Sequence, residues 1–453
     1  MDKLISSVNA IVWGVPALVL ILGVGIMLTV RTRFAQFRLF PLAIKSFFGK
    51  LFTKKKGEVS AFQALCTALA ATVGTGNIAG VAGAIAIGGP GAVFWMWVSA
   101  GVGMITKYAE ATLAVRFRAK HHNEYMGGPM YYIKMGLPSR WHKLAAVYCV
   151  FGVIAAFGMG NATQINAVIG GIHSALSAAE IAYSWKLDVC IGAICAVSVT
   201  VLLLGGAKRV GRFAEMLVPF ASVAYILLCL GVLMLRFRAI PAALHAILQG
   251  AFSPRGVTGG IVGSVFCTLR VGVSRGVFTN EAGMGTAAIA HAGASVKHPS
   301  EQGLMGIMEV FLDTVVICTL TALAILCSDA QVLYGVDEGA LLTARAFSSV
   351  YGHWSNIALA LFLCLFAFAT MLGWGLYGVR CAQYLFGKRK WKLFVYMQAV
   401  VITLSVFLKT GTVWMLSETV NGLMAIPNLI ALALLAPVAE RLTKEYEKGA
   451  PRI

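Results

Sequence analysis

Long runs of apolar residues dominate this chain, and they recur at intervals from one end to the other. A helix that crosses a bilayer needs roughly 20 mostly apolar residues, and each of these runs meets or approaches that length. Runs such as residues 199–204 and 429–435 do not alternate apolar and polar positions, as strands of a membrane barrel would. The pattern therefore predicts an all-α membrane protein with about eleven transmembrane helices. The predicted segments are 10–30, 61–87, 91–116, 144–173, 187–206, 213–235, 259–292, 302–327, 354–381, 391–409 and 417–437.

Two of these segments are interrupted by glycine together with polar residues. The second contains Gly74-Thr75-Gly76-Asn77, and the seventh contains Thr279-Asn280-Glu281 followed by two further glycines. An unwound backbone is tolerated at membrane depth only where protein encloses it or where it lines a cavity. Close helix packing is the alternative explanation for the glycines, but packing does not call for Asn and Glu in the middle of a bilayer. We therefore expect two broken helices.

The two interrupted segments lie at matching places along the chain. Each is followed by four further segments, so the chain divides into one extra N-terminal helix and two groups of five. An odd number of spans per group gives the two groups opposite topology, which is typical of secondary transporters with inverted repeats. The predicted units are an N-terminal helix with its basic loop (1–60), a first repeat (61–235), a second repeat (259–437) and a tail (438–453).

Charge is scarce and unevenly placed. Charged residues make up 12% of the chain, and 37 Lys and Arg against 18 Asp and Glu give a formal net charge of +19. With these spans, most basic residues fall in the loops after odd-numbered segments, above all 31–60 and 116–143. The positive-inside rule then predicts an N-terminus outside and a C-terminus in the cytoplasm, with no secretory signal peptide. The positive charge thus reflects topology, and the sequence offers no motif for nucleic-acid binding.

Other functional classes find little support. The ten cysteines lie in or beside apolar segments without a CxxC pair, so we expect buried small side chains and no metal site or disulfide framework. No nucleophile–base or zinc motif lies within the segments, and His291 has no obvious partner, so we do not expect an enzyme. A channel would call for rings of like charges or carbonyls from several subunits, and a single asymmetric pair of broken helices argues against it.

The interrupted segments and several other motifs together give the chain a family resemblance. It resembles the alanine or glycine:cation symporter family, also called sodium:alanine symporters, over nearly its whole length. The motifs are VGTGNIAGV (73–81), GGPGAVFWMW (88–97), KYAE (107–110), GGPMY (127–131), GVFTNEAGMG (276–285), FLDT (311–314) and LGW (372–374).

The resemblance implies a leucine-transporter type of fold and a sodium- or proton-driven importer of small neutral amino acids in a prokaryotic inner membrane. It places the substrate against Thr75, Gly76 and Asn77 of the first broken helix and against Phe278, Thr279 and Asn280 of the second. It further implies Gln164 and Trp374 beside the substrate, and Thr370 near a cation. The family places no enzymatic cofactor in this fold, and the oligomeric state stays open.

Elementary chemistry assigns roles to these residues. An amino acid is a zwitterion, so donors from Gly74 to Asn77 suit its carboxylate, and oxygens near Asn280 suit its ammonium group. Sodium takes oxygen ligands, which the carbonyls near Thr72 and Val73 and the hydroxyl of Thr370 can supply. Trp374 and Phe278 are candidate pocket walls, although they are otherwise ordinary bundle aromatics.

The ionisable residues within the segments leave alternatives open. Glu281 either lines the site or pairs with Arg275 or Arg270, and we favour the pairing because an ion inside a membrane normally needs a partner. Glu110 and Lys107 lie three residues apart on one helical face, which favours a local pair. Asp313 serves as an anchor or as a gate, and Glu418 is expected to be solvated or to cap a helix.

Two departures from the family pattern bear on the coupling ion. Val379 stands where relatives carry an acid, and Glu309 adds an acid just before the FLDT motif. A carboxyl group within the membrane can carry a proton as well as pair with a cation. The alternatives to sodium-coupled uptake of alanine and glycine are therefore a proton-coupled symporter, or one that prefers another small neutral amino acid such as glutamine.

Overall fold

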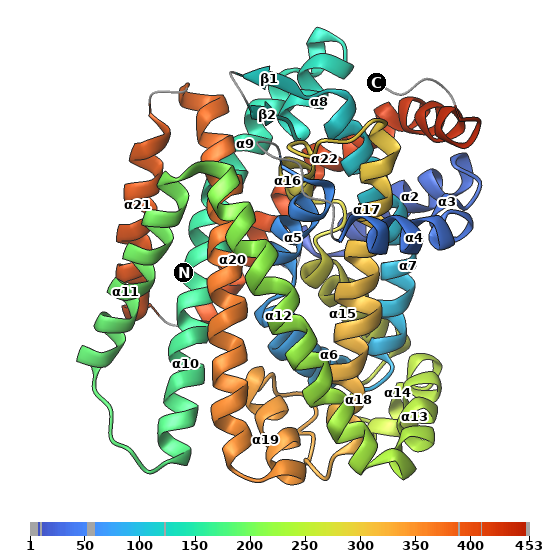
Figure 1. The fold of residues 1–453 in the computed structure, drawn as a ribbon. Helices are drawn as coiled ribbons and strands as arrows, with labels where there is room; N and C mark the ends of the chain where they lie inside the picture. The colour runs from blue at the N-terminus through green and yellow to red at the C-terminus, as the bar shows by residue number, and fades with distance from the viewer. Residues whose placement is uncertain are drawn as a thin grey trace.

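A computed structural model gives the architecture and describes residues 8–9, 11–51, 59–121, 124–387, 390–408 and 410–449. Within these ranges the chain is almost entirely helical, apart from one small antiparallel hairpin of β1 (Ala119–His121) and β2 (Glu124–Met126) (Figure 1). Parts of the predicted N-terminal unit and tail, residues 1–7, 10, 52–58 and 450–453, lie outside the described residues.

Each predicted segment coincides with helix. In chain order the corresponding elements are α2 (Val15–Arg31); α5 (Ala61–Thr72), η1 (Gly76–Gly80) and α6 (Val81–Gly88); α7 (Ala92–Arg116); α9 (Lys143–Phe157), η3 (Gly158–Ala162) and α10 (Thr163–Ala178); α11 (Trp185–Leu204); α12 (Gly206–Leu235); α15 (Val265–Asn280) and α16 (Thr286–His291); α17 (Pro299–Val310), η5 (Phe311–Cys318) and α18 (Thr319–Cys327); α20 (Trp354–Phe386); α21 (Trp391–Leu404) and η6 (Ser405–Phe407); and α22 (Thr410–Glu447).

Shorter helices connect these elements at the two ends of the bundle. They are α3 (Ala35–Arg38), α4 (Phe40–Lys50), α8 (Pro129–Gly136), η2 (Ser139–Trp141), η4 (Phe237–Ala239), α13 (Ile240–Phe252), α14 (Pro254–Thr258) and α19 (Ala340–Tyr351).

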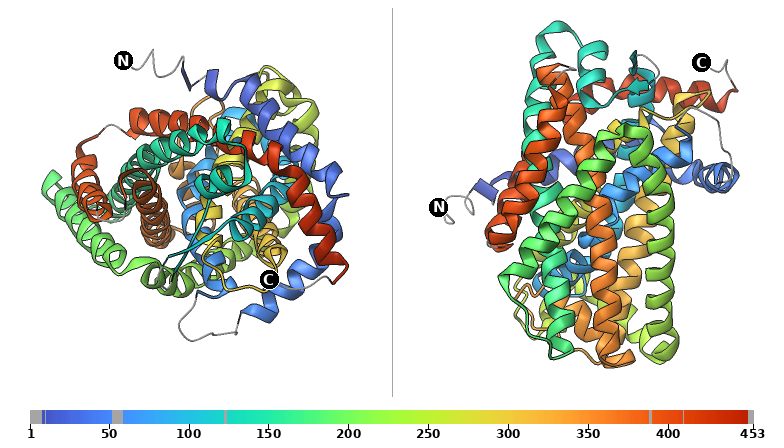
Figure 2. Two further views of the ribbon diagram at one scale, coloured as in Figure 1. Left: turned by 90° about the horizontal axis from the view of Figure 1, so that it is seen from above. Right: turned by 60° about the vertical axis from the view of Figure 1, so that its left-hand side comes forward.

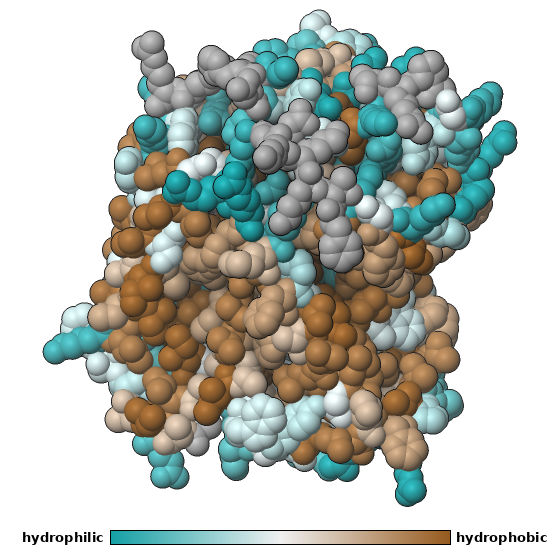
Figure 3. Space-filling model, viewed as in Figure 1, coloured by the Kyte–Doolittle hydropathy of each residue, from teal (hydrophilic) through white to brown (hydrophobic). Residues whose placement is uncertain are grey.

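By length and composition, six helices of the described chain could cross a membrane, or seven if the bent pair α5 and α6 forms one span. Two others, α2 and the α21–η6 segment, are apolar but shorter. The structure thus supports a multi-pass membrane protein, while the predicted number of eleven spans is not confirmed. Figure 3 agrees, because apolar side chains form a broad band across the face that it shows, between polar side chains above and below.

The helix α2 lies beside the last helix of the chain. The Trp13 indole donates to the Glu418 carbonyl at 2.8 Å, and Arg31 pairs with Glu440. The helices α2 and α22 therefore run side by side in the same direction. Figure 2 shows the N-terminal helices of the chain on the outside of the bundle.

Close backbone contact joins the helices that surround the centre of the bundle. A side chain at Gly306 of α17 would meet the Lys107 carbonyl of α7 at 2.8 Å, and one at Gly276 of α15 would meet Ser99 at 2.2 Å. Small residues permit this approach between membrane helices. The helices α15 and α17 consequently pack directly on α7, which brings their polar residues together in the interior.

Both predicted breaks are present. The helices α5 and α6 are bent by 53° about Val73 and Gly74. The helix α15 ends at Asn280, and the following segment 281–285 contains three positive φ angles, at Glu281 (54°), Gly283 (90°) and Gly285 (76°). This left-handed backbone suits glycine, which explains the two glycines there. The π-helical turns η3 and η5, by contrast, interrupt two segments that the apolar pattern presented as continuous.

Candidate functional site

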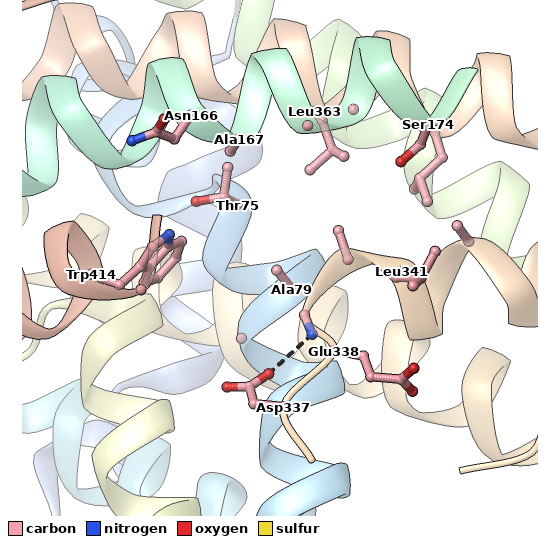
Figure 4. Close-up of a pocket in the computed structure, with 18 of the residues that line it drawn as sticks. Thr75, Ala79, Asn166, Ala167, Ser174, Asp337, Glu338, Leu341, Leu363 and Trp414 are labelled. Carbon is pink, nitrogen blue, oxygen red and sulfur yellow. Dashed lines mark hydrogen bonds between the residues drawn. The ribbon is translucent and has the colours of Figure 1, made fainter. Parts of the chain in front are cut away.

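A cavity of about 700 Å³ leads into the bundle towards the first break. The helices α10, α19 and α22 and the π-turn η1 contribute to its wall, and Figure 4 shows Thr75, Asn166 and Trp414 facing one another across it. Asp337 and Glu338 lie where the chain enters α19, which Figure 1 places at the end of the molecule opposite β1, α8 and the C-terminus. The cavity thus connects that end of the molecule with Thr75.

The first break is held by one amide side chain. The Gly74 backbone N–H donates to Asn77 Oδ1 at 2.8 Å, and Asn77 Nδ2 donates to Asp313 Oδ1 at 2.7 Å. Asn77 therefore uses both ends of its amide, one within the break and one towards η5. Asp313 accepts this bond and so connects η5 to the break. This contact is of the kind expected for an anchor, one of the two roles considered for Asp313.

The second broken helix adjoins the first. A side chain at Gly76 would meet Thr279 Cγ2 at 3.1 Å, so the two backbones are nearly in contact there. Asn280 Nδ2 donates to Thr314 Oγ1 at 3.0 Å, and that hydroxyl donates to Asp313 Oδ2 at 2.8 Å. The two predicted motifs are thus brought together through Asp313 and Thr314.

The remaining predicted substrate residues take different positions around the cavity. Thr75 lines it and donates to Gln164 Oε1 at 3.3 Å. Gln164 Nε2 donates to the Met159 carbonyl of the π-turn η3, so the widened turn orients this side chain. Phe278 is buried behind the lining residue Trp414, with ring centroids 5.6 Å apart. Of the nine predicted substrate residues, Thr75 lies in the cavity wall, and the other eight are buried and are not among the residues that line the cavity.

The three predicted cation residues meet at the first break. Thr370 Oγ1 lies 2.7 Å from the position that a side chain at Gly74 would take, so the hydroxyl stands directly against the break. It donates to its own helix at the Phe366 carbonyl, which leaves its lone pairs available. Thr72 and Val73 end α5 at the same point. A hydroxyl next to the end of an interrupted helix offers the oxygen donors that a hard cation requires.

The favoured pairing of Glu281 with Arg275 or Arg270 is wrong. Glu281 accepts from the Trp374 indole N–H at 2.8 Å and from the Thr286 hydroxyl at 2.6 Å. Glu281 follows the end of α15 at Asn280, and Arg275 within α15 pairs with Asp337 and Glu418. Trp374 is therefore fixed by Glu281 and packs against Gly160, where a side chain would meet its Cβ at 2.4 Å.

Arg275 has partners that the sequence did not indicate. It donates to Glu418 Oε1 at 2.9 Å and to Asp337 Oδ2 at 3.2 Å, and all three residues line the cavity. Glu418 therefore does not cap a helix, because it lies within α22, and its side chain is ion-paired while it remains 22% exposed. This cluster joins α15, α22 and the loop before α19 at the cavity.

The expected pair of Lys107 with Glu110 is also wrong. Lys107 Nζ donates to Glu309 Oε1 of α17 at 2.8 Å, and His291 Nε2 bonds the other oxygen of Glu309 at 2.9 Å. Gln302 Nε2 completes this chain at His291 Nδ1, 2.7 Å away. The additional acid Glu309 thus has a partner, and so does His291. The close approach of α17 to α7, which the sequence shows only as glycines, decides this pairing.

Several residues that line the cavity were not predicted from the sequence. Asn166, Trp414 and the acidic pair Asp337 and Glu338 all line it. The acidic pair lies in the loop between the predicted segments 302–327 and 354–381, and Trp414 lies near the start of the last helix among ordinary apolar residues. Only the tertiary arrangement brings them together, so the sequence carried no signal for them.

Comparisons with known proteins agree over the whole chain. The profile of the sodium:alanine symporter family matches residues 1–452. The "Sodium/alanine symporter AgcS" of Methanococcus maripaludis is 41% identical over 453 residues, which covers 98% of this chain and 97% of the relative. The "Probable sodium/glutamine symporter GlnT" of Bacillus subtilis is 36% identical over 451 residues, covering 99% and 91%.

Solved structures support the fold. MhsT in complex with L-phenylalanine superposes with a TM-score of 0.59 at 15% sequence identity, covering 86% of this chain and 99% of MhsT. A nucleobase-cation-symport-1 family transporter in a closed conformation gives a TM-score of 0.52 at 14% identity, covering 86% and 93%. Both are transporters of the leucine-transporter type of fold, which the family resemblance had implied.

Proposed function

The chain belongs to the sodium:alanine symporter family, whose members are sodium-coupled amino-acid transporters, and from this premise we propose that it imports alanine and glycine together with sodium by alternating access. One observation carries the proposal. The two interrupted helices meet through the Asp313–Thr314 pair at the inner end of a cavity that reaches Thr75. A transporter of this fold binds its substrate at such a junction, near the middle of the membrane.

Each end of a small zwitterion finds matching groups there. The substrate carboxylate would approach the break at Gly74, Thr75 and Gly76, where the two glycines permit close approach to the backbone; the Gly74 N–H itself is held by Asn77. The ammonium group would approach the oxygens of Thr279 and Asn280. Gln164, Phe278 and Trp374 would bound the side chain, and Asn77 would hold the first break in shape.

Sodium would bind beside the substrate, at Thr72, Val73 and Thr370. The hydroxyl of Thr370 lies against Gly74, so a bound cation would touch the same break that holds the carboxylate. Occupation of one site would then favour occupation of the other, because both stabilise the same backbone conformation. This arrangement would couple the two fluxes.

The proposed orientation follows from where the ion pairs lie. Basic residues of the predicted inside loops pair with acids of the same end, as Arg38 does with Glu447 and Arg380 with Glu124. We propose that this end is cytoplasmic in a prokaryotic inner membrane, with the N-terminus outside. The cavity would then open outwards. The segments 61–235 and 259–437 would form the two five-helix repeats that move against each other.

A related proposal is uptake of a larger neutral amino acid such as glutamine. It is favoured by the 36% identity to a protein described as a sodium/glutamine symporter. A pocket wall discriminates a single methylene by only about 1–3 kcal/mol, so a preference among small side chains should be graded. Competition of alanine, glycine and glutamine for uptake of labelled alanine into proteoliposomes separates the two. Strong inhibition by glutamine at lower concentration than alanine would reject alanine as the preferred substrate.

A further inference from the structure

The buried interior holds more carboxylates than positive charges. Among the described residues, the carboxyl side chains exposed to 1% or less are Glu110, Glu281, Glu309 and Asp313, and Lys107 is the only Lys or Arg buried to this degree. Lys107 bonds Glu309, so this pair is balanced. The other three carboxyl groups have no ion-pair partner in the described chain. A bare charge in such surroundings is unfavourable, and such groups are paired, take up a proton or hold a cation.

Hydrogen bonding distinguishes these three groups. Both oxygens of Glu281 and both oxygens of Asp313 accept a bond from a protein donor. Glu110 differs, because Oε1 accepts from the Gly285 N–H at 3.0 Å and from Asn428 Nδ2 at 2.7 Å, while Oε2 has no partner among the described residues. Two donors thus converge on one oxygen of Glu110, and the other oxygen is bare.

The groups around Glu110 do not suit a cation. Asn428 turns its amide nitrogen towards Glu110, and its amide oxygen accepts from the Tyr132 hydroxyl. The Gly283 carbonyl already accepts from Asn428 Nδ2 at 2.8 Å. Sodium would need several free oxygen ligands at this point, whereas the nearby oxygens are engaged and the groups aimed at Glu110 are N–H donors. A proton, which needs only the bare oxygen, satisfies the arrangement.

We propose that Glu110 is a proton-binding site, protonated on Oε2, and that its proton is linked to the position of the unwound segment 281–285. Oε1 holds this segment directly at Gly285, and Asn428 holds it at Gly283. Loss of the proton leaves an anion that needs water, and water reaches Oε2 only when the segment moves off α7 and α22. Release of the proton to water therefore accompanies opening at this place.

The neighbouring charges support this linkage. Two charged side chains act on Glu110: the carboxylate of Glu309 from α17, which repels an anion there, and the ammonium group of Lys107 from α7, which attracts it. The neutral phenols of Tyr132, Tyr148 and Tyr377 from α8, α9 and α20 lie nearby. The one ammonium group nearby is that of Lys107, which bonds Glu309. Because the charge of Lys107 is balanced by Glu309, an ionised Glu110 would be a buried anion without an ion-pair partner in the described chain, and the proton removes that charge.

Infrared spectroscopy of the purified protein in lipid nanodiscs tests the site without reference to any substrate. A protonated carboxyl group gives a C=O stretching band that a carboxylate lacks. Titration of the wild type, Glu110→Gln and the control Glu301→Gln, whose carboxylate pairs with Lys50 at the surface, should show part of this band lost in Glu110→Gln alone. An unchanged band in Glu110→Gln would overturn the proposal, because the proton would then lie on Glu281 or Asp313.

Hydrogen exchange of residues 281–292 tests the linkage, and it keeps the proposal falsifiable if Glu110→Gln does not fold. After correction for intrinsic exchange rates, protection of this segment in the wild type should fall about tenfold per pH unit over the range in which Glu110 is ionised in the open protein and still protonated in the closed protein. It should level off once the closed protein has also lost this proton. Glu110→Gln, where it folds, should show protection independent of pH. Protection in the wild type that does not change with pH would contradict the linkage, while alanine uptake could still proceed as proposed.

Discussion

Removal of the Asn77 side chain is the most informative perturbation of the proposed substrate site. In Asn77→Ala, the Gly74 N–H loses its acceptor at 2.8 Å and Asp313 Oδ1 loses its donor at 2.7 Å, and both groups are buried. Each buried group left without a partner is destabilised by about 1–3 kcal/mol. The bent conformation about Gly74 should therefore lose roughly 2–6 kcal/mol relative to other arrangements of the chain.

That free energy translates into binding. Since 1.4 kcal/mol corresponds to a factor of ten, affinity for substrate should fall by about 30-fold at the lower limit and by about 10⁴-fold at the upper. Equilibrium binding of labelled alanine to purified protein measures the loss, and a monodisperse elution profile shows that the variant is folded. Thr67→Val is the matched control, because its buried hydroxyl on the same helix α5 bonds only the Gln63 carbonyl of that helix. We expect nearly unchanged binding for it.

The outcome can refute the reasoning plainly. If Asn77→Ala binds alanine as the wild type does, the bent backbone is not what binds the substrate. If Thr67→Val loses as much as Asn77→Ala, the effect reports general damage to α5.

Three further predictions concern the cation site, the buried ion pair and the cavity. Thr370→Val should raise the sodium concentration for half-maximal uptake at least about tenfold, because one oxygen ligand is lost. Thr370→Ser keeps the hydroxyl and should have the sodium dependence of the wild type. Equal sodium dependence in the two variants would show that Thr370 does not bind the cation. Glu309→Gln should lower the free energy of unfolding by about 3–5 kcal/mol, because Lys107 is left as an unpaired buried charge. Thermal unfolding should show that the double variant Glu309→Gln, Lys107→Met regains part of this stability. Arg275→Ala should abolish the ion pairs that join α15, α22 and the loop before α19, so labelled substrate should dissociate faster from the protein. An unchanged dissociation rate would show that Arg275 does not restrict the exit of substrate through the cavity.

The sequence predicted what depends on local composition. Apolar runs predicted the helices, and glycine beside polar residues predicted both breaks, because each signal is contained within a few neighbouring residues. The π-turn η3 was not predicted, although Gly158, Gly160 and Asn161 also place glycine beside a polar residue, because the surrounding segment was taken as one continuous apolar helix. Yet this turn orients Gln164 towards Thr75, so its consequence lies in the site.

Side-chain pairing was predicted poorly because it depends on which helices meet. Lys107 and Glu110 share a helical face, but α17 packs on α7 closely enough for Glu309 to take the lysine. Glu281 lies where the chain turns left-handed, so its carboxylate points to Trp374 of α20 and away from Arg275. The family resemblance implied that both breaks lie against the substrate, but the link between them through Asp313 and Thr314 appears only in the structure.

Sodium dependence of alanine uptake tests the central claim most directly. Purified protein in proteoliposomes would be given an inward sodium gradient at equal pH on both sides, and separately a proton gradient without sodium. Concentrative uptake driven by the sodium gradient, saturable in alanine and absent without sodium, is the predicted result. Uptake driven by the proton gradient alone would contradict sodium coupling at Thr72, Val73 and Thr370, and flux that does not saturate with alanine would contradict a transporter with a substrate site at the two breaks.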